Sequence, residues 1–232
     1  MLNPKPSRLL LLTSLLALCA ACQQTPAQLV ETTSDGSAVA ETKDAQAGLE
    51  KKELSKAYFA SGCFWCVEAV YESVRGVEES ISGYAGGHTE NPTYELSNTG
   101  RTGHAEAVEV YYDPAVVDFE SLVDVYFGSQ NITQQNGQGP DRGSQYRSIL
   151  FYQNEDEKRI IETKIAALNA SLDGEKVAAE VMPFKKFWIG EDYHQDYEKK
   201  HPDHPYIRNV SIPRLERFQA KFPELLKDSA GH

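Results

Sequence analysis

The sequence is short of positive charge. It carries 23 Lys and Arg residues against 34 Asp and Glu residues, which gives a formal net charge of −11. Binding to nucleic acid requires a basic face that neutralises phosphates, so this balance argues against a nucleic-acid partner. The apolar fraction of 41% is still sufficient for a real core in one domain of ordinary size. The composition indicates a soluble, globular domain.

The sequence also lacks an apolar run long enough to cross a bilayer comfortably. Near the N-terminus, two basic residues precede the apolar stretch Leu9 to Leu18, and Ala20-Ala21 provides a small-residue site before Cys22. This order is typical of a secretory leader, which is removed, rather than of a membrane-spanning helix. We therefore predict that residues 1–21 are a signal peptide and that the protein is exported.

Small residues directly before Cys22 resemble the bacterial lipoprotein processing site, in which the cysteine becomes the acylated first residue. Cys19 stands three positions earlier, where leucine is usual, and a plain signal peptide that leaves Cys22 as an ordinary thiol is the alternative. The lipoprotein interpretation predicts a protein anchored to a membrane of the cell envelope, on the periplasmic side, through a lipid on Cys22.

Large apolar side chains are almost absent after the leader. Between residues 23 and 53 no aromatic residue occurs, and Gln, Thr, Ser, Ala, Glu and Lys dominate. A segment of this composition cannot bury enough apolar surface to form a core. We predict a flexible tether over residues 22–53 that holds a folded domain off the membrane surface.

Cysteine is scarce as well: of four in the chain, only Cys63 and Cys66 follow the leader and its processing site. An apolar run at 57–60 predicts a strand, and the pattern after it predicts a helix from Phe64. Cys63 would then stand at the positive end of the helix, which favours its thiolate and indicates a nucleophile. The spacing permits a disulfide after modest local opening, so the pair can cycle. A structural disulfide and half of a metal site are the alternatives.

Gly62-Cys63-Phe64-Trp65 resembles the active-site motif of the peptide methionine sulfoxide reductases of the A type. Further matching stretches recur in the order of that family over about residues 55–206: Gly83–Gly87, Asn91–Tyr94, Thr102–Val108 and Gln138–Ser148. One departure is Gln130-Asn131-Ile132, where family members usually carry His-Asp-Pro. The resemblance implies a two-layer α/β sandwich with a ferredoxin-like core, and the reduction of methionine-S-sulfoxide to methionine.

The order of the predicted elements agrees with that fold class. Strands and helices interleave, as in an α+β domain whose helices pack against a mixed sheet. We assign the reductase domain to residues 54–210 and a C-terminal helical extension to residues 211–232. The predicted elements are strands at 77–85, 104–112, 145–152 and 176–182, and helices after Asp118, over 154–172 and over 191–200.

Alternation along residues 104–112 places Glu106 on one strand face with Val108 and Val110. At the rim of an apolar face, desolvation favours the neutral carboxylic acid and raises its pKa, so Glu106 is predicted to be a proton donor. The alternative is a solvated acid at a strand end, as we expect for Glu109 on the opposite face.

Further polar candidates are predicted in or beside loops. Tyr94 follows Pro92 in a loop, Asp141 lies between glycines, and Tyr146 lies near the start of the next strand. From the residues alone, Tyr94 can also be a partly packed surface residue and Asp141 a plain turn residue. The remaining histidines lack metal-like spacing and are expected to cap helices or to be solvated: His194, His201 and His204.

The chemistry of sulfoxide reduction gives each candidate a role. Cys63 attacks the sulfoxide sulfur while Glu106 protonates the oxygen. Tyr94 and Tyr146 stabilise the charge that develops on that oxygen. Cys63 is left as a sulfenic acid, and Cys66 condenses with it to a disulfide, which an external thioredoxin-type dithiol must reduce.

Phe64 and Trp65 would hold the S-methyl group, and Asp141 would orient bound water or Tyr146. No metal or organic cofactor is required, and the expected partners are oxidised proteins, free methionine sulfoxide and the reductant. A monomer is expected. A thioredoxin-like disulfide exchanger and a non-catalytic tethered binding lipoprotein are the rival interpretations, although disulfide exchange needs neither Phe-Trp between the cysteines nor an acid at position 106.

Overall fold

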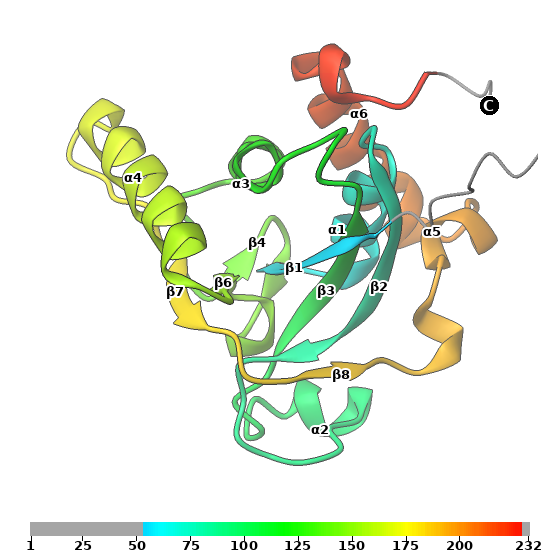
Figure 1. Ribbon diagram of the computed structural model, residues 1–232. Helices are drawn as coiled ribbons and strands as arrows, with labels where there is room; N and C mark the ends of the chain where they lie inside the picture. The colour runs from blue at the N-terminus through cyan, green and yellow to red at the C-terminus, as the bar shows by residue number, and fades with distance from the viewer. Residues whose placement is uncertain (1–52, 229–232) are drawn as a thin grey trace, which may run out of the picture. The chain divides into compact units, whose positions relative to one another are not determined.

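The computed structural model describes residues 53–228; the predicted signal peptide, Cys22 and all but the last residue of the predicted tether lie outside the described residues. One six-stranded sheet, in the order β7-β6-β1-β3-β2-β8, organises this part of the chain (Figure 1). Strands β6 and β7 pair in parallel and the other neighbours are antiparallel, so the sheet is mixed. The strands are β1 (Ser55–Ser61), β2 (Val77–Ala85), β3 (Ala105–Tyr112), β6 (Ser148–Tyr152), β7 (Glu180–Pro183) and β8 (Phe187–Ile189).

The central strands and two helices form a split β-α-β arrangement. The chain order is β1-α1-β2-β3-α3-β6, while the order in the sheet is β6-β1-β3-β2. This is the ferredoxin-like topology, so the predicted α+β fold class with a mixed sheet is confirmed. The helices are α1 (Phe64–Glu72), α2 (Tyr94–Asn98), α3 (Phe119–Gly128), α4 (Glu155–Ser171), α5 (Tyr197–Lys200) and α6 (Ile212–Lys221), and a small hairpin pairs β4 (Gly137–Gln138) with β5 (Asp141–Arg142).

Both faces of the sheet are buried. The helix-facing side carries the larger core, to which β1 contributes Phe59, stacked on Tyr71 of α1 at 4.9 Å between ring centroids. On the other face Tyr58 stacks on Phe184 at 3.6 Å, so the segment before β8 covers this side. The expectation that Glu109 is solvated is wrong for this reason. Its carboxylate is buried and accepts hydrogen bonds from the hydroxyl groups of Tyr58 (2.7 Å) and Tyr111 (2.8 Å).

Three predicted elements are shorter or more broken than expected. The strand predicted over 145–152 begins only at Ser148, and residues 144–146 form a 3-10 turn. The strand predicted over 176–182 is confined to β7. The helix predicted over 191–200 is a 3-10 turn followed by α5, because Asp196 between them has a left-handed backbone with φ of 54°. Irregular backbone of this kind is set by tertiary contacts that periodicity does not report.

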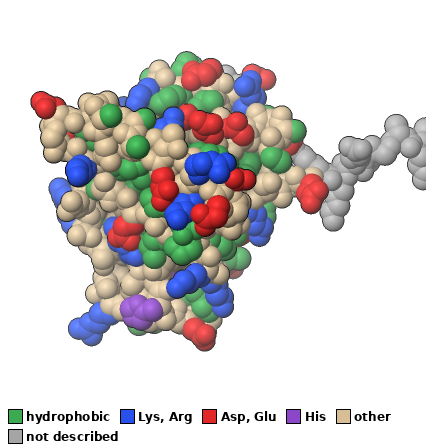
Figure 2. Space-filling view, turned by 60° about the vertical axis from the view of Figure 1, so that its left-hand side comes forward, with side chains coloured by type: hydrophobic (Ala, Val, Ile, Leu, Met, Phe, Trp, Pro, Cys, Tyr) green, Lys and Arg blue, Asp and Glu red, His purple; other side chains and the backbone are tan. Residues whose placement is uncertain are grey.

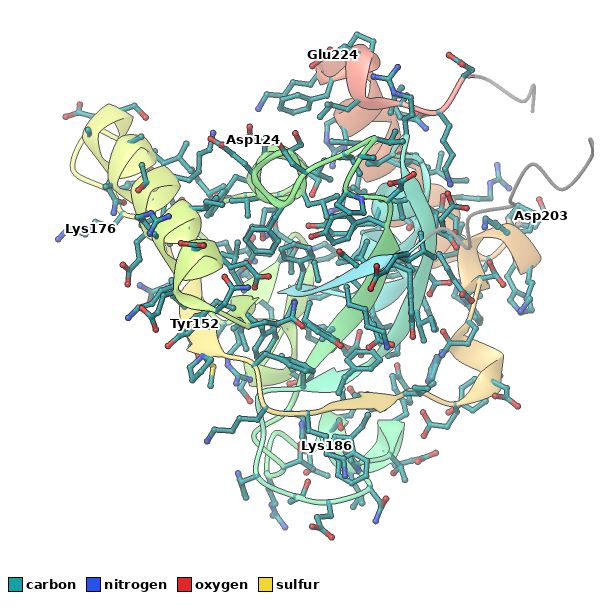
Figure 3. The ribbon with its side chains drawn as sticks, viewed as in Figure 1. Asp124, Tyr152, Lys176, Lys186, Asp203 and Glu224 are labelled. Carbon is teal, nitrogen blue, oxygen red and sulfur yellow. The ribbon has the colours of Figure 1, made fainter. Side chains whose placement is uncertain are left out.

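Helix α4 forms where its pattern predicts. The side chain of Asn154 accepts a hydrogen bond from the backbone N–H of Glu157 and so caps the helix. Only Ile161 is fully buried, and charged side chains of both signs are interspersed over the molecular face in Figure 2. Asp124 of α3, labelled in Figure 3, makes an ion pair with Lys164 of α4. Among residues 53–228, no helix has both the length and the apolar character needed to cross a membrane.

The C-terminal residues that we set apart as an extension pack into the core. Phe218 of α6 is 1% exposed and belongs to the helix-side core. Arg214 of the same helix is buried and donates hydrogen bonds to the carbonyl oxygen of Ser61 (2.9 Å) and to that of Ser129 (2.8 Å). Helix α6 therefore stabilises the end of β1, where the cysteine motif begins.

This packing predicts the effect of truncating Phe218. Phe218→Ala would leave a cavity beneath α6 and should lower the free energy of unfolding by about 3–5 kcal/mol. Urea denaturation of the domain measures this change. Leu96→Ala removes an apolar side chain that is 52% exposed and is the matched control, with an expected change below about 0.5 kcal/mol. An equal, small effect of both substitutions would contradict the packing of α6 into the core.

Candidate active site

The cysteine motif lies in the turn between β1 and α1. Gly62 has φ of +82°, and a Cβ atom at this position would lie 2.5 Å from the Cβ of Gln138, so only glycine fits. Cys63 is the residue that precedes the first turn of α1, and its carbonyl oxygen accepts a hydrogen bond from the backbone N–H of Val67. Its side chain is 7% exposed. Cys66 follows one turn later on the buried side of the same helix.

Glu106 reaches this turn from β3. Its Oε2 accepts the backbone N–H of Phe64, the first residue of α1, at 3.0 Å. The residue is 2% exposed, on the strand face where alternation predicts it. Burial raises the pKa of Glu106 to about 8, and the charges of Asp141 and Cys66 add to the effect, while the N–H of Phe64 opposes it. The carboxyl is therefore mainly protonated at neutral pH.

Two tyrosines lie in the electrostatic field of this carboxyl. Burial raises the pKa of Tyr94 and of Tyr146, and the charges of Glu106 and Cys63 raise both further. Both hydroxyl groups therefore remain protonated donors. The prediction that Tyr94 lies in a loop is wrong, because Tyr94 is the first residue of α2. Its backbone N–H donates a hydrogen bond to Oε1 of Glu191 at 2.9 Å. Tyr146 lies in the 3-10 turn before β6.

Aromatic rings surround the first turn of α1. Phe64 is buried, with its ring 6.4 Å from that of Tyr94, and Trp65 stacks on Tyr197 of α5 at 3.7 Å. The expectation that His194 caps a helix or is solvated is wrong. It is 1% exposed, and its Nδ1 accepts a hydrogen bond from the indole N–H of Trp65 at 3.1 Å. His194 fixes the orientation of the indole, and the polar sequence around it gives no periodic signal of that role.

Two further residues at the site come from the C-terminal part of the chain. The hydroxyl of Tyr206 donates to Oδ2 of Asp141 at 2.6 Å and lies 3.7 Å from Sγ of Cys66. Arg214, whose guanidinium also donates to Oγ of Ser61 at 2.7 Å, is a buried cation near the same sulfur. Sequence reasoning missed both, because each is one tyrosine or arginine in an ordinary helical pattern. Asp141 is thus bonded to Tyr206 rather than to Tyr146.

The two thiols have opposite pKa shifts. Burial raises the pKa of Cys63 well above its ordinary value, and the hydrogen bond with Cys66 and the charges of Cys66 and Glu106 add to this. The hydrogen bond from Cys63 lowers the pKa of Cys66 to about 6, helped by the charge of Arg214 and opposed by burial. The expected preference for a Cys63 thiolate is not found, because burial and two acidic neighbours outweigh the helix end. The directions of the two shifts favour a thiolate on Cys66 over one on Cys63.

Known proteins resemble this chain over most of its length. The family model described as Peptide methionine sulfoxide reductase matches residues 55–226. The chain is 45% identical over 172 residues to a peptide methionine sulfoxide reductase MsrA of Pasteurella multocida, a match that covers 74% of this chain and 98% of that protein. The chain belongs to the peptide methionine sulfoxide reductase family. The predictions of this family, of its A type and of an enzyme are confirmed.

Other relatives support the family and the fold. A peptide methionine sulfoxide reductase MsrA of Thermus thermophilus is 44% identical over 171 residues, covering 74% of this chain and 97% of that protein. Reduced Mxr1 from Saccharomyces cerevisiae superposes with a TM-score of 0.61 at 32% identity, over 67% of this chain and 90% of that chain. Methionine sulfoxide reductase A of Corynebacterium diphtheriae superposes with a TM-score of 0.59 at 35% identity, over 64% of this chain and 76% of that chain. The family match extends 16 residues past the predicted boundary at 210, in keeping with the packing of α6.

One group of carboxylates among residues 53–228 has the spacing of a cation site. Oxygen atoms of Glu68, Glu72 and Asp196 lie within 4.8 Å of one another. Nζ of Lys199 lies 2.7 Å from Glu72 and 3.1 Å from Asp196, so an ammonium group already neutralises this cluster. It is separate from Cys63 and supplies a structural ion-pair network.

The raised pKa of Glu106 predicts how the reductase step depends on pH. Glu106 carries its proton below about pH 8, so the rate of methionine formation should fall as the pH rises through 8 and this donor is lost. Glu106→Gln should slow the step by about 10²-fold and remove this decline. Single-turnover mixing from pH 6 to 10 measures both enzymes. A wild-type profile that parallels that of Glu106→Gln would exclude Glu106 as the acid.

Proposed function

We propose that the enzyme reduces methionine-S-sulfoxide, free and in proteins, through a Cys63 sulfenic acid that Cys66 resolves and a thioredoxin-type dithiol recycles. The observation that carries this proposal is the buried carboxyl of Glu106, bonded to the helix turn that presents Cys63. A sulfoxide oxygen cannot leave sulfur as an oxide dianion at neutral pH. A soft nucleophile and a neutral acid must therefore act on the two atoms of the S=O group together.

The proton arrangement of the thiol pair defines the first step. Sγ of Cys63 attacks the sulfoxide sulfur, and the proton of its thiol passes to the hydrogen-bonded thiolate of Cys66. Glu106 gives its proton to the oxygen, which ends on Cys63 as the sulfenic acid as methionine leaves. Tyr94 and Tyr146 donate hydrogen bonds to the oxygen while negative charge develops on it. Phe64 and Trp65 provide an apolar surface for the S-methyl group.

The second step forms the disulfide. Sγ of Cys66 attacks Sγ of the Cys63 sulfenic acid, and the hydroxyl group leaves as water with the proton of Cys66. Arg214 favours this step because its charge stabilises the Cys66 thiolate. Asp141 accepts the hydroxyl of Tyr206 and so orients it toward Cys66. Reduction of the disulfide by an external dithiol then restores both thiols, and no metal or organic cofactor takes part.

The direct test mixes the purified domain with each epimer of methionine sulfoxide and a thioredoxin-type reductant. We expect methionine from the S epimer only. Cys66→Ser should form about one equivalent per enzyme and then stall, because thioredoxin needs a disulfide to attack, and Cys63→Ser should form none. Dithiothreitol is kept out of this assay, since a small thiol can reduce the sulfenic acid directly. Normal turnover of Cys66→Ser with thioredoxin would contradict the role of Cys66.

We further propose that Cys22 carries a lipid that holds the enzyme at a membrane of the cell envelope. The support is the charged and apolar leader with Ala-Ala before Cys22, followed by a segment suited to a tether. Membrane fractionation and intact mass of the mature chain test this. Wild type should be membrane-bound and begin at an acylated Cys22, whereas Cys22→Ser should lose the lipid. A soluble wild-type protein that begins elsewhere would refute the anchor.

A further inference from the structure

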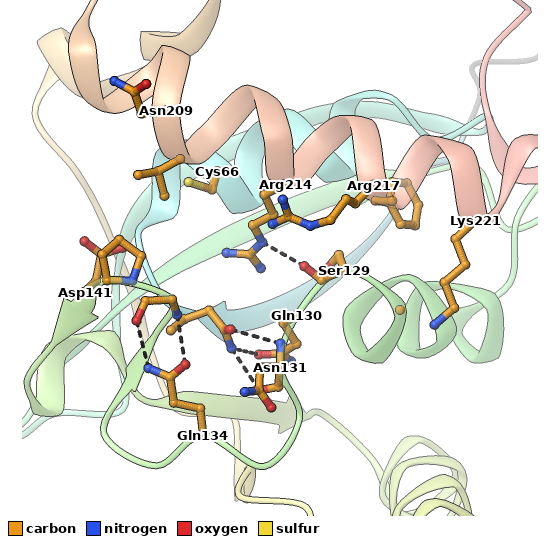
Figure 4. Close-up of a pocket in the computed structure, with 16 residues that line it drawn as sticks. Cys66, Ser129, Gln130, Asn131, Gln134, Asp141, Asn209, Arg214, Arg217 and Lys221 are labelled. Carbon is orange, nitrogen blue, oxygen red and sulfur yellow. Dashed lines mark hydrogen bonds between the residues drawn. The ribbon is translucent and has the colours of Figure 1, made fainter.

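A groove lies beside Cys66, and most of its lining residues have no role in the two steps above. It encloses about 720 Å³ between α6 and the loop that carries Gln130 and Asp141, and Figure 4 shows the α6 side chains directed toward it. Cys66 lies in its wall, whereas Cys63, Phe64 and Trp65 are not among the described residues that line it. The groove therefore borders the resolving cysteine, which is 2% exposed, rather than the nucleophile and its aromatic pocket.

The groove is positively charged in an acidic protein. Arg214, Arg217 and Lys221 line it from α6, at spacings of three and four residues that place them on one helix face. The whole chain carries a net charge of −11, so this cluster opposes the overall sign. Arg217 and Lys221 are exposed and form no ion pair with any of residues 53–228. A ligand with acidic groups would therefore find two cations available, beside the buried cation of Arg214.

Amide side chains line the opposite wall. The side-chain oxygen of Gln130 accepts from Gln138 Nε2 (3.0 Å) and from Ser148 Oγ (2.9 Å), but its own amide nitrogen is buried and donates to no described residue. Among the described residues that line the groove, Asp141 is the only acid, and it accepts a hydrogen bond from the hydroxyl of Tyr206. The charge of the groove favours a partner rich in carboxylates.

We propose that this groove is the docking surface for the protein dithiol that recycles the enzyme, an acidic reductant of thioredoxin type, and that the reductant attacks Sγ of Cys66. The inference rests on the proposed function. As the reductant thiolate bonds to Cys66, the Cys63–Cys66 bond breaks, and the Cys63 thiolate takes a proton from the adjacent carboxyl of Glu106, which has regained from solvent the proton that it gave in the first step. The second reductant thiol then displaces Cys66. The reductant loses two electrons and two protons, and the enzyme regains two thiols.

The first experiment reverses the charge of the groove. In the double variant R217E and K221E, we expect turnover with an acidic thioredoxin to fall about tenfold relative to turnover with dithiothreitol, which is uncharged and is not steered. Raising the ionic strength from about 0.01 M to about 1 M, which shortens the Debye length from about 30 Å to about 3 Å, should reduce the wild-type rate with thioredoxin but hardly change that of the double variant.

Lys185→Glu is the matched control, because Lys185 is exposed and is not among the residues that line the groove. Its neighbour Lys186 lies at the opposite end of the molecule from Glu224, which follows α6 (Figure 3). This substitution should leave unchanged both the ratio of turnover with thioredoxin to turnover with dithiothreitol and the salt dependence of the thioredoxin rate. An equal effect of Lys185→Glu would show a general charge effect and overturn the proposal. An increased KM for the oxidised protein substrate, with the thioredoxin rate intact, would assign the groove to the substrate and also overturn it.

The second experiment identifies the sulfur that is attacked. Enzyme oxidised by one equivalent of methionine sulfoxide is mixed with a thioredoxin whose second active-site cysteine is serine, and the trapped mixed disulfide is digested and mapped by mass. We expect the link at Cys66; a link at Cys63 would overturn the proposal. Methionine release and disulfide formation are measured first in the same sample. If neither occurs, the proposed function fails and the inference falls with it; if both occur, the groove alone is under test.

Discussion

The hydrogen bond between the carboxyl of Glu106 and the backbone N–H of Phe64 is the constraint on which the site depends. The first N–H groups of a helix have no partner inside the helix, and here one of them is satisfied by a strand side chain. This contact joins β3 to the start of α1 and places an acid beside Cys63. Because the same packing excludes water, the carboxyl stays neutral at the pH where a proton donor is needed.

Burial that keeps Glu106 neutral also keeps Cys63 protonated, and the pair of cysteines resolves this conflict. The thiolate forms on Cys66, where the hydrogen bond from Cys63 and the charge of Arg214 stabilise it. In the mechanism that we propose, Cys63 loses its proton as it attacks, to the Cys66 thiolate hydrogen-bonded to it. A buried, protonated thiol is a poor target for oxidants, so burial protects Cys63 from them.

Sequence reasoning could predict the parts of the site that lie within regular elements. The strand before Gly62, the helix after it and the inward side of Glu106 all follow from periodicity, and the ferredoxin-like order follows from the resemblance. His194, Tyr206 and Arg214 could not be predicted, because they reach the site through turns and a final helix whose position depends on tertiary packing. The prediction that Glu109 is solvated failed for a related reason. Alternation along one strand does not show that a distant segment covers the second face of the sheet.

The loop that departs from the family pattern is coupled to the cysteine turn through Gln138. Its side-chain amide accepts the N–H of Asn131 (2.9 Å) and donates to Gln130 Oε1 and to the carbonyl of Asn131, both at 3.0 Å. The Cβ of the same residue limits position 62 to glycine. The amide side chains of Gln138 and Gln130, together with the backbone of Asn131, therefore hold the loop against the turn that presents Cys63. The same loop forms one wall of the groove at Cys66, so a change in its sequence changes the surface beside that cysteine.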